Sequence, residues 1–399
     1  MSTLVFVPYQ DIYDFSKTEI MTREYSMLLI LMKMLHQPRL VCIGKPRTII
    51  DKCDLSFTDF PDNSNELQVK NIIMSAIKIR LVKPFSLDMI LHRRGWWPNG
   101  YIRTLNLLTK LDFEDKIIVY SNNPFSWPVI NYFSNKGATI FFDMMDNFAI
   151  HPSLNNFEKK IAYKGYSHSF SKASFICCNS EQSKKYCANH FGINVSLIKN
   201  GVFHVSNDDI LLNNSFKSKL TYIKRKYVRI VGYVGKIGLR IDEQLLKDVM
   251  GRCLDTAFVF VGPEMSTQKN KNLSNVFCQY SNAFQVGAIP SSDVLSVIKA
   301  FDVLMIPHSV GIKENGGDPL KLYQYLSSGK PIITTGILGV DEFSKIIKIS
   351  NSAEEWVRYI NCNQYLFHGN YMIPKSIYWE NRIQPLKKFI EGTINENLF

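Results

Sequence analysis

The chain lacks the paired cysteines that build zinc sites and redox motifs. Its eight cysteines are scattered, and none has a second cysteine or a histidine at metal-ligand spacing. Cys177 and Cys178 are adjacent in an apolar run, where neighbouring strand residues face opposite sides and cannot hold one ion together. We therefore expect reduced cysteines that serve in packing, no bound metal and a cytoplasmic location.

The chain also lacks a long hydrophobic run. Its longest apolar run, Met27–Met32, is far too short to cross a bilayer. Polar residues follow the early apolar segment Leu4–Pro8 at once, so that segment does not resemble a signal peptide. We expect a globular protein that is soluble or peripherally bound to a membrane.

Apolar strands and helical segments alternate along the chain in two series. The 399 residues, 46% of them hydrophobic, are enough for two or three domains with full cores. The first series runs from Leu4–Pro8 to Ser174–Asn179, and the second from Arg229–Val234 to Pro331–Thr334. The polar stretch Ser206–Ser218 lies between them. This alternation is typical of α/β domains with parallel sheets.

Positive charge is unevenly distributed. The formal net charge is +12, and the segment from Val69 to Lys110 contains eight basic residues and one acid. Apolar and aromatic residues lie among these charges, which predicts a basic surface that contacts a membrane interface or a substrate bound there. A solvated basic face is the simpler alternative, and no nucleic-acid-binding signature is present. The residues assigned to this surface are Lys78, Arg80, Arg93, Arg94, Trp96 and Trp97.

A glycine turn in the second series predicts a phosphate site. After the strand Arg229–Val234 the chain reads GKIGLR, in which Gly235, Lys236 and Arg240 combine open backbone with positive charge. The glycine spacing does not match the dinucleotide motif GxGxxG, so NAD binding is not expected. A tight packing turn is the alternative explanation.

A second turn begins the segment GGDPLKLYQYLSSGKPII, from Gly316 to Ile333, which predicts a turn, a helix and a buried strand. Amides at a helix start attract phosphate. An ordinary surface helix would explain this segment alone, but two cationic turns in one domain favour a ligand site. The residues predicted to bind a nucleotide here are Gly316, Gly317, Asp318, Lys321, Tyr323 and Gln324.

The order of these motifs resembles the nucleotide-sugar half of a GT-B glycosyltransferase. VGYVGKIGLRID is followed by FVFVG, VGAIP, FDVLMIP and PLKLYQYLSSGKPII. Upstream, FFDMMDNFAIHP, FICCNSE and SLIKNGV resemble the acceptor half. The resemblance covers nearly the whole chain. The chain is similar to glycosyltransferase family 4, and to the teichuronic-acid or xanthan glucuronosyltransferase-like enzymes that build bacterial surface polysaccharides.

This resemblance implies an α/β chain of two Rossmann-like domains whose parallel sheets face each other across a cleft. It implies an acceptor domain over residues 1–202 with a crossover helix over 376–399, and a donor domain over 203–375. The donor would be a UDP- or GDP-linked sugar. The acceptor would be a glycan or glycolipid, such as a lipid-linked oligosaccharide or lipopolysaccharide, in O-antigen or capsule synthesis at the inner face of the plasma membrane. No cofactor and no nucleic acid are implied.

One departure from the family bears on mechanism. Many retaining members carry two carboxylates around this loop and helix, and the matching positions here hold Gly316 and Gln324. Their loss weakens a retaining assignment and favours an inverting displacement, in which a base takes the proton of the acceptor hydroxyl. No metal is expected, because Asp143 and Asp146 are spaced DxxD, unlike the DxD of the metal-dependent GT-A fold. Asp143 and Asp146 are the candidate bases, because they end a predicted strand of the acceptor half; capping the next segment is the alternative role.

Two other functions remain open at this point. A sugar-nucleotide epimerase or hydrolase would use the same donor half without a separate acceptor site. A non-catalytic glycosyltransferase-like scaffold would explain the two missing carboxylates. Lys321 and Arg240, which would stabilise the leaving diphosphate, argue against the scaffold.

Overall fold

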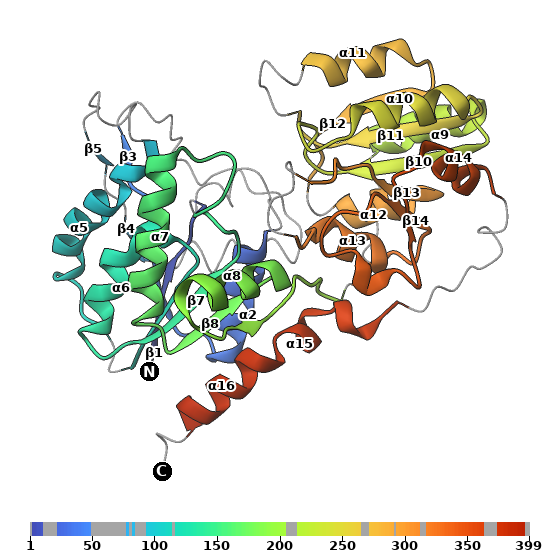
Figure 1. Ribbon diagram of the computed structural model, residues 1–399. Coiled ribbons are helices and arrows are strands. Elements are labelled where there is room, and N and C mark those ends of the chain that lie inside the picture. The colour runs from blue at the N-terminus through green and yellow to red at the C-terminus, as the bar shows by residue number, and fades with distance from the viewer. Residues whose placement is uncertain are drawn as a thin grey trace. The chain divides into compact units, whose positions relative to one another are not determined.

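The structure is a computed structural model that describes residues 2–10, 22–48, 77–79, 82–83, 93–113, 116–204, 214–264, 271–290, 293–311, 317–362 and 373–395. The chain divides into two compact units (Figure 1). Unit 1 comprises Met1–Lys199 with Ile383–Phe399, and unit 2 comprises Asn200–Arg382. The sequence suggests boundaries after residues 202 and 375, whereas these units divide after Lys199 and Arg382.

Unit 1 contains a seven-stranded sheet in the order β4-β2-β1-β6-β7-β8-β9, and all neighbouring strands are parallel. The strands are β1 (Ser2–Val7), β2 (Arg39–Ile43), β4 (Ile77–Ile79), β6 (Lys116–Ser121), β7 (Thr139–Met144), β8 (Phe175–Cys178) and β9 (Ser196–Leu197). β3 (Arg47–Thr48) and β5 (Val82–Lys83) form a separate pair. The strand order reverses between β1 and β6, which makes that position the topological switch point.

The described helices of unit 1 cover both faces of this sheet. They are α2 (Arg23–Met34), α5 (Trp97–Leu108), α6 (Trp127–Ser134), α7 (Asn156–Phe170), α8 (Glu181–Phe191) and α16 (Gln384–Asn395), with short 3₁₀ turns η1 (Arg93–Trp96) and η2 (Pro124–Ser126). Local sequence sets their ends. Asn155 and Glu158 form a reciprocal capping box at the start of α7, and α8 ends at Gly192 in the left-handed conformation.

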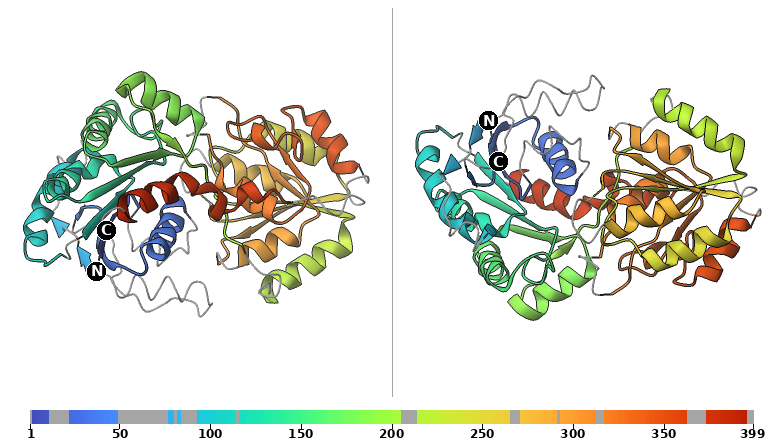
Figure 2. Two further views of the ribbon diagram at one scale, coloured as in Figure 1. Left: turned by 90° about the horizontal axis from the view of Figure 1, so that it is seen from below. Right: turned by 90° about the horizontal axis from the view of Figure 1, so that it is seen from above.

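The strand pleat sends alternate residues of β7 to different helical layers. Phe142 belongs to the buried core that α5, α6, α7 and α8 complete. Its neighbour Phe141 faces the other way, with its ring centroid 5.6 Å from that of Phe389 on α16. Asp143 shares that second face, where it contacts Arg23 of α2. Figure 2 shows α2 and α16 together on this face of the sheet.

Unit 2 contains a six-stranded parallel sheet in the order β12-β11-β10-β13-β14-β15. The strands are β10 (Arg229–Val234), β11 (Thr256–Val261), β12 (Ala283–Gly287), β13 (Val303–Ile306), β14 (Ile332–Thr334) and β15 (Lys348–Ile349). The helices are α9 (Asn214–Lys226), α10 (Glu243–Arg252), α11 (Lys271–Gln279), α12 (Val294–Lys299), α13 (Leu320–Ser327), α14 (Ala353–Asn361) and α15 (Trp379–Arg382), with 3₁₀ turns η6 (Asp341–Phe343) and η8 (Lys375–Ile377). Here the switch point lies between β10 and β13.

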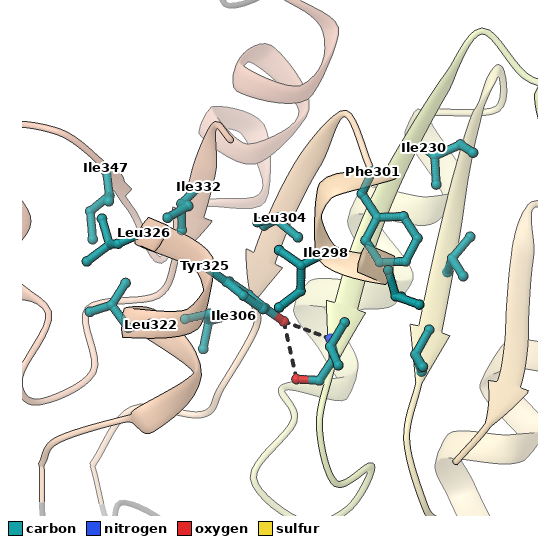
Figure 3. Close-up of a cluster of buried hydrophobic side chains, with 14 of the residues drawn as sticks. Ile230, Ile298, Phe301, Leu304, Ile306, Leu322, Tyr325, Leu326, Ile332 and Ile347 are labelled. Carbon is teal, nitrogen blue, oxygen red and sulfur yellow. Dashed lines mark hydrogen bonds between the residues drawn. The ribbon is translucent and has the colours of Figure 1, made fainter. Parts of the chain in front are cut away.

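Both faces of the unit 2 sheet are buried. One core lies under α9, α12 and α13, and the other lies under α10, α11 and α14. Figure 3 shows the first of these, in which the Tyr325 hydroxyl accepts a hydrogen bond from Val234 N at 2.7 Å and donates to Val234 O at 3.3 Å. The prediction of two parallel α/β units is therefore confirmed.

A glycine inside β10 makes this packing possible. A Cβ atom at Gly232 would lie 1.9 Å from the buried ring of Phe301. We expect Gly232→Ala to lower the free energy of unfolding by about 1–3 kcal/mol, because the ring must move within a close-packed core. Urea unfolding checks this. Gly251→Ala is the control, because its Cβ would make only ordinary contact with Tyr280; equal midpoints for the two variants would contradict the prediction.

Candidate functional site

The carboxyl ends of β10 and β13 lie side by side at the switch point of unit 2. Beyond β10 the chain turns at Gly235, whose φ of 142° favours glycine. The loops after the two strands are joined, since Asp242 N donates to Pro307 O at 2.8 Å and Ser309 N donates to Arg240 O at 2.7 Å. The glycine turn and the loop after β13 therefore form one edge, where parallel sheets commonly bind ligands.

Lys321, in the first turn of α13, extends its ammonium group to this edge. Lys321 Nζ lies 2.6 Å from the hydroxyl of Tyr233 and 3.2 Å from Nε2 of His308. It also lies 3.9 Å from the centroid of the Tyr233 ring. A Cβ atom at Gly235 would lie 2.8 Å from this nitrogen, so a side chain there would displace the ammonium group.

The charges that act on Lys321 and His308 are positive. Burial lowers the pKa of Lys321 well below its usual value, and the nearby charge of Arg240 lowers it further. Burial also lowers the pKa of His308, with smaller contributions from Lys321 and Arg240. Among the described residues no carboxylate bonds to Lys321. Such a cluster is suited to an anion that brings its own negative charge.

The remaining predicted donor residues fall into two groups. Lys236 and Arg240 are exposed beside the glycine turn, and Gln324 is half-buried on α13. Gly317 has a φ of 73°. Its carbonyl oxygen packs closely against Gly339, where an added Cβ atom would lie 2.1 Å from that oxygen. Of these residues, Arg240 acts electrostatically on Lys321. Gly316 lies outside the described residues.

Asp318 and Tyr323 are held within the fold. The Asp318 carboxylate accepts hydrogen bonds from Asn200 N and from the hydroxyl of Tyr323, and Tyr323 is fully buried. Asn200 Nδ2 also donates to Asp318 O at 2.9 Å. These contacts tie the start of α13 to the chain at Asn200, so they favour a role in shaping the loop.

Unit 1 has a titratable group at its own switch point, which our sequence analysis missed. Glu24 is fully buried in the first turn of α2, and its Oε1 accepts from Tyr9 N at 2.8 Å, Gln10 N at 3.1 Å and Asn122 Nδ2 at 2.6 Å. Its Oε2 has no hydrogen-bond partner in the described part of the chain. Burial raises the pKa of Glu24 to about 7, and the charge of Asp146 adds to the increase.

The two predicted bases occupy different environments. Asp143 lies inside β7 and is fully buried, with Arg23 donating to its two oxygens at 2.7 and 3.1 Å. The Tyr120 hydroxyl donates to the same carboxylate at 2.9 Å. Asp146 follows β7, is half-buried and is close enough to affect Glu24 electrostatically. The geometry gives Asp143 a structural ion pair and leaves Asp146 at the carboxyl edge.

The predicted basic surface is described only in part. Arg94 is half-buried, and its Nη1 lies 3.4 Å from Oε1 of Glu158. Trp97 packs within unit 1, with ring centroids 5.7 Å from Tyr9 and 5.6 Å from Phe125. Trp96 is also half-buried. For Lys78 and Arg93 only the backbone is described, and Arg80 lies outside the described residues.

We found no matching family model for this sequence. Over 197 residues the chain is 21% identical to the putative teichuronic acid biosynthesis glycosyltransferase TuaH of Bacillus subtilis strain 168, a match that spans 48% of each protein. HepE of Anabaena, solved with UDP and glucose, matches 100% of this chain over 99% of its own length, with a TM-score of 0.62 and 13% identity. The chain has the GT-B fold. Sucrose-phosphate synthase of Thermosynechococcus elongatus matches equally completely, with a TM-score of 0.65 and 12% identity.

Within this GT-B fold, each unit has a side chain with a strongly shifted pKa at the switch point of its sheet: Glu24 in unit 1 and Lys321 in unit 2. No group of acidic, histidine or cysteine side chains among the described residues could hold a metal ion. No described helix is long and apolar enough to cross a membrane. The five cysteines Cys42, Cys177, Cys178, Cys187 and Cys253 are buried and unbridged.

Glu24 should give the protein a distinctive pH dependence. Its pKa is about 7 in the folded chain against a usual value of 4.5, so the folded state holds an extra proton between these values. The free energy of unfolding therefore falls as pH rises through this window, by at most about 3 kcal/mol from this group. We expect Glu24→Gln to remove that decline in urea unfolding at pH about 5 and 8. The exposed Glu354→Gln serves as control, and identical pH profiles for all three proteins would refute the assignment.

Proposed function

We propose that the chain is a glycosyltransferase that moves a sugar from a nucleotide-diphosphate sugar to a glycan or glycolipid acceptor in cell-surface polysaccharide synthesis. The observation that carries the proposal is the cationic edge of unit 2, where Lys321 lies beside His308 and Arg240 and no carboxylate among the described residues bonds to Lys321. A diphosphate supplies the charge that this edge lacks. HepE, which shares the GT-B fold, was solved with UDP, and UDP is therefore our first candidate nucleotide.

The donor would be held by charge and backbone together. Lys321 and Arg240 would bind the diphosphate, and amides near Gly235 and Gly317 would approach it closely because neither glycine carries a side chain. Gln324 would contact ribose hydroxyls, since an amide both donates and accepts. Lys236, exposed at the same turn, would add to the positive potential.

The acceptor would bind at the carboxyl edge of unit 1. The buried side-chain atoms there that have no hydrogen-bond partner among the described residues include Asn147 Nδ2 after β7 and Asn179 Oδ1 after β8. Buried polar atoms are normally satisfied, and sugar hydroxyls can both donate and accept. These atoms support an acceptor rich in hydroxyl groups. TuaH is named for teichuronic acid biosynthesis, which is consistent with a polysaccharide acceptor.

The reaction we propose is a direct displacement. The acceptor oxygen forms a bond to the anomeric carbon, the bond from that carbon to the diphosphate breaks, and the nucleoside diphosphate leaves with the electron pair. Asp146 takes the proton from the acceptor hydroxyl. Lys321 and Arg240 stabilise the charge on the leaving group. Inversion follows from a single displacement, and the lack of carboxylates at Gly316 and Gln324 supports it.

Membrane contact would involve the exposed face of α5. Ile102 and Leu107 are 46% and 41% exposed there, Arg103 is exposed on the same helix, and the exposed Lys110 follows in the turn after it. Apolar and basic side chains in this arrangement suit the interface of an anionic membrane. We propose that this face brings the enzyme to a lipid-linked acceptor.

Nucleotide binding tests the donor site. In a thermal-shift screen of UDP, GDP and CMP, one nucleotide should stabilise the protein by about 2.7 kcal/mol at a concentration of 100 times its Kd. Lys321→Met should weaken that binding about tenfold or more, because a charged hydrogen bond is lost. The same change should raise the melting temperature without ligand: the pKa of Lys321 is lowered on folding, so the unfolded state binds more protons at neutral pH.

The control for this test is Lys226→Met, which removes an exposed cation just before the amino end of β10. It should leave both quantities unchanged. No stabilisation by any of the nucleotides would favour the non-catalytic scaffold instead.

A matched pair of carboxylate variants tests the base. Asp146→Asn should lower the transfer rate by about 10²–10⁴-fold and leave nucleotide binding intact. Asp143→Asn should instead lower the free energy of unfolding by about 3–5 kcal/mol, because Arg23 is left buried without its charged partner. Sugar transfer measured by product mass and stability measured by urea unfolding separate the two effects. An active, fully stable Asp146→Asn protein would rule out Asp146 as the base.

A further inference from the structure

We infer that His308 and Tyr233 are positioning residues that aim the Lys321 ammonium group at the donor diphosphate, and that diphosphate binding draws a proton into this group of side chains. The inference rests on the proposed function and deepens it, since it names how the same site recognises its ligand. His308 was not among the residues that our sequence analysis selected. The available signal was its position two residues after the end of β13.

The hydrogen-bond geometry of the site determines which of Tyr233, Lys321 and His308 donate and which accept. The Tyr233 hydroxyl donates its one proton to Lys236 O at 2.9 Å. Its oxygen must therefore accept from Lys321, 2.6 Å away. Nε2 of His308 lies 3.2 Å from Lys321 Nζ and 3.3 Å from the Tyr233 oxygen. Because an ammonium group can only donate, His308 Nε2 accepts from Lys321, and the neutral ring carries its hydrogen on Nδ1.

This assignment leaves one donor of Lys321 for a ligand. An ammonium group has three N–H donors, and two of them are directed to Tyr233 and His308. The glycine turn provides space beside the nitrogen, since Gly235 has no Cβ. Gly262 of the next loop extends this bare surface, because its own Cβ would lie 2.1 Å from Gly235 O. A phosphate oxygen is a small, charged acceptor suited to such a place.

Charge explains why a proton should accompany the ligand. The groups that face Lys321 are Tyr233 on β10, His308 after β13 and Arg240 in the loop after β10, and no carboxylate bonds to it in the described ranges. Burial and Arg240 lower the pKa of Lys321, so its proton is weakly held before ligand arrives. A diphosphate reverses the local potential and favours the ammonium form. Proton uptake on binding also means that affinity rises as pH falls.

Titration calorimetry with UDP in two buffers of different ionisation enthalpy measures the uptake. At pH about 8.5 the terminal phosphate of UDP is already ionised, so protons counted there belong to the protein. The wild type should take up a substantial fraction of one proton, Lys226→Met should match it, and Lys321→Met should take up almost none. Normal UDP affinity without uptake at pH about 8.5 would overturn the inference and leave the proposed function standing. If UDP and GDP both fail to bind to the wild type, the proposed function and the inference both fail.

Variants of His308 and Tyr233 test the positioning role. His308→Gln places an oxygen acceptor near the position of Nε2, so UDP affinity should stay within about threefold of wild type. His308→Leu and Tyr233→Phe remove an acceptor and should each weaken UDP binding about tenfold. Uridine, which lacks the diphosphate, should bind all three variants as it binds wild type, which would show that the site remains folded. Equal UDP affinity for His308→Leu and His308→Gln would contradict the role.

Discussion

The reversal of strand order within each parallel sheet is the constraint on which both candidate sites depend. Chain segments leaving β10 and β13 diverge to opposite faces of the unit 2 sheet, and those leaving β1 and β6 diverge in the same way in unit 1. Divergence leaves room at the carboxyl edge that no connecting segment must cross. In unit 2 glycines keep that room open, and Lys321 reaches it from the start of α13.

The two switch points carry opposite chemistry. Unit 2 holds the half-buried amine of Lys321, whose cation is costly to form, and unit 1 holds a buried acid, Glu24, whose anion is costly to form. Each arrangement reduces the stability of the ligand-free protein near neutral pH, a cost typical of sites built for charged or polar ligands. By contrast, the Arg23–Asp143 pair is satisfied within the fold, and its strong hydrogen bonds fix α2 against the sheet.

Local patterns in the sequence were sufficient to predict the architecture. Apolar strands ending in glycine turns identified the parallel sheets, and the cationic segment after Pro319 led directly to Lys321 and its helix. These features succeed because strand periodicity and turn chemistry act over a few residues. The order of the motifs along the chain also indicated the GT-B fold.

The residue roles that the sequence did not predict all depend on contacts between residues far apart in the chain. Asp143 looked like a base because nothing nearby marks its pairing with Arg23, which is 120 residues away in the chain. Glu24 looked like an ordinary acid in a helix, and only burial between β1 and β6 distinguishes it. His308 acquires its role through Tyr233 and Lys321, which come from two other elements. Such pairings are fixed by tertiary packing.

Amide hydrogen exchange with and without UDP is the measurement that tests the central claim most directly, since it locates the nucleotide on the chain. The account predicts slower exchange on UDP addition in three segments of unit 2: the turn after β10, the loop after β13 and the first turn of α13. Exchange at the switch point of unit 1 should change little with UDP alone. Protection confined to unit 1, or UDP binding that leaves all three segments of unit 2 unchanged, would contradict it.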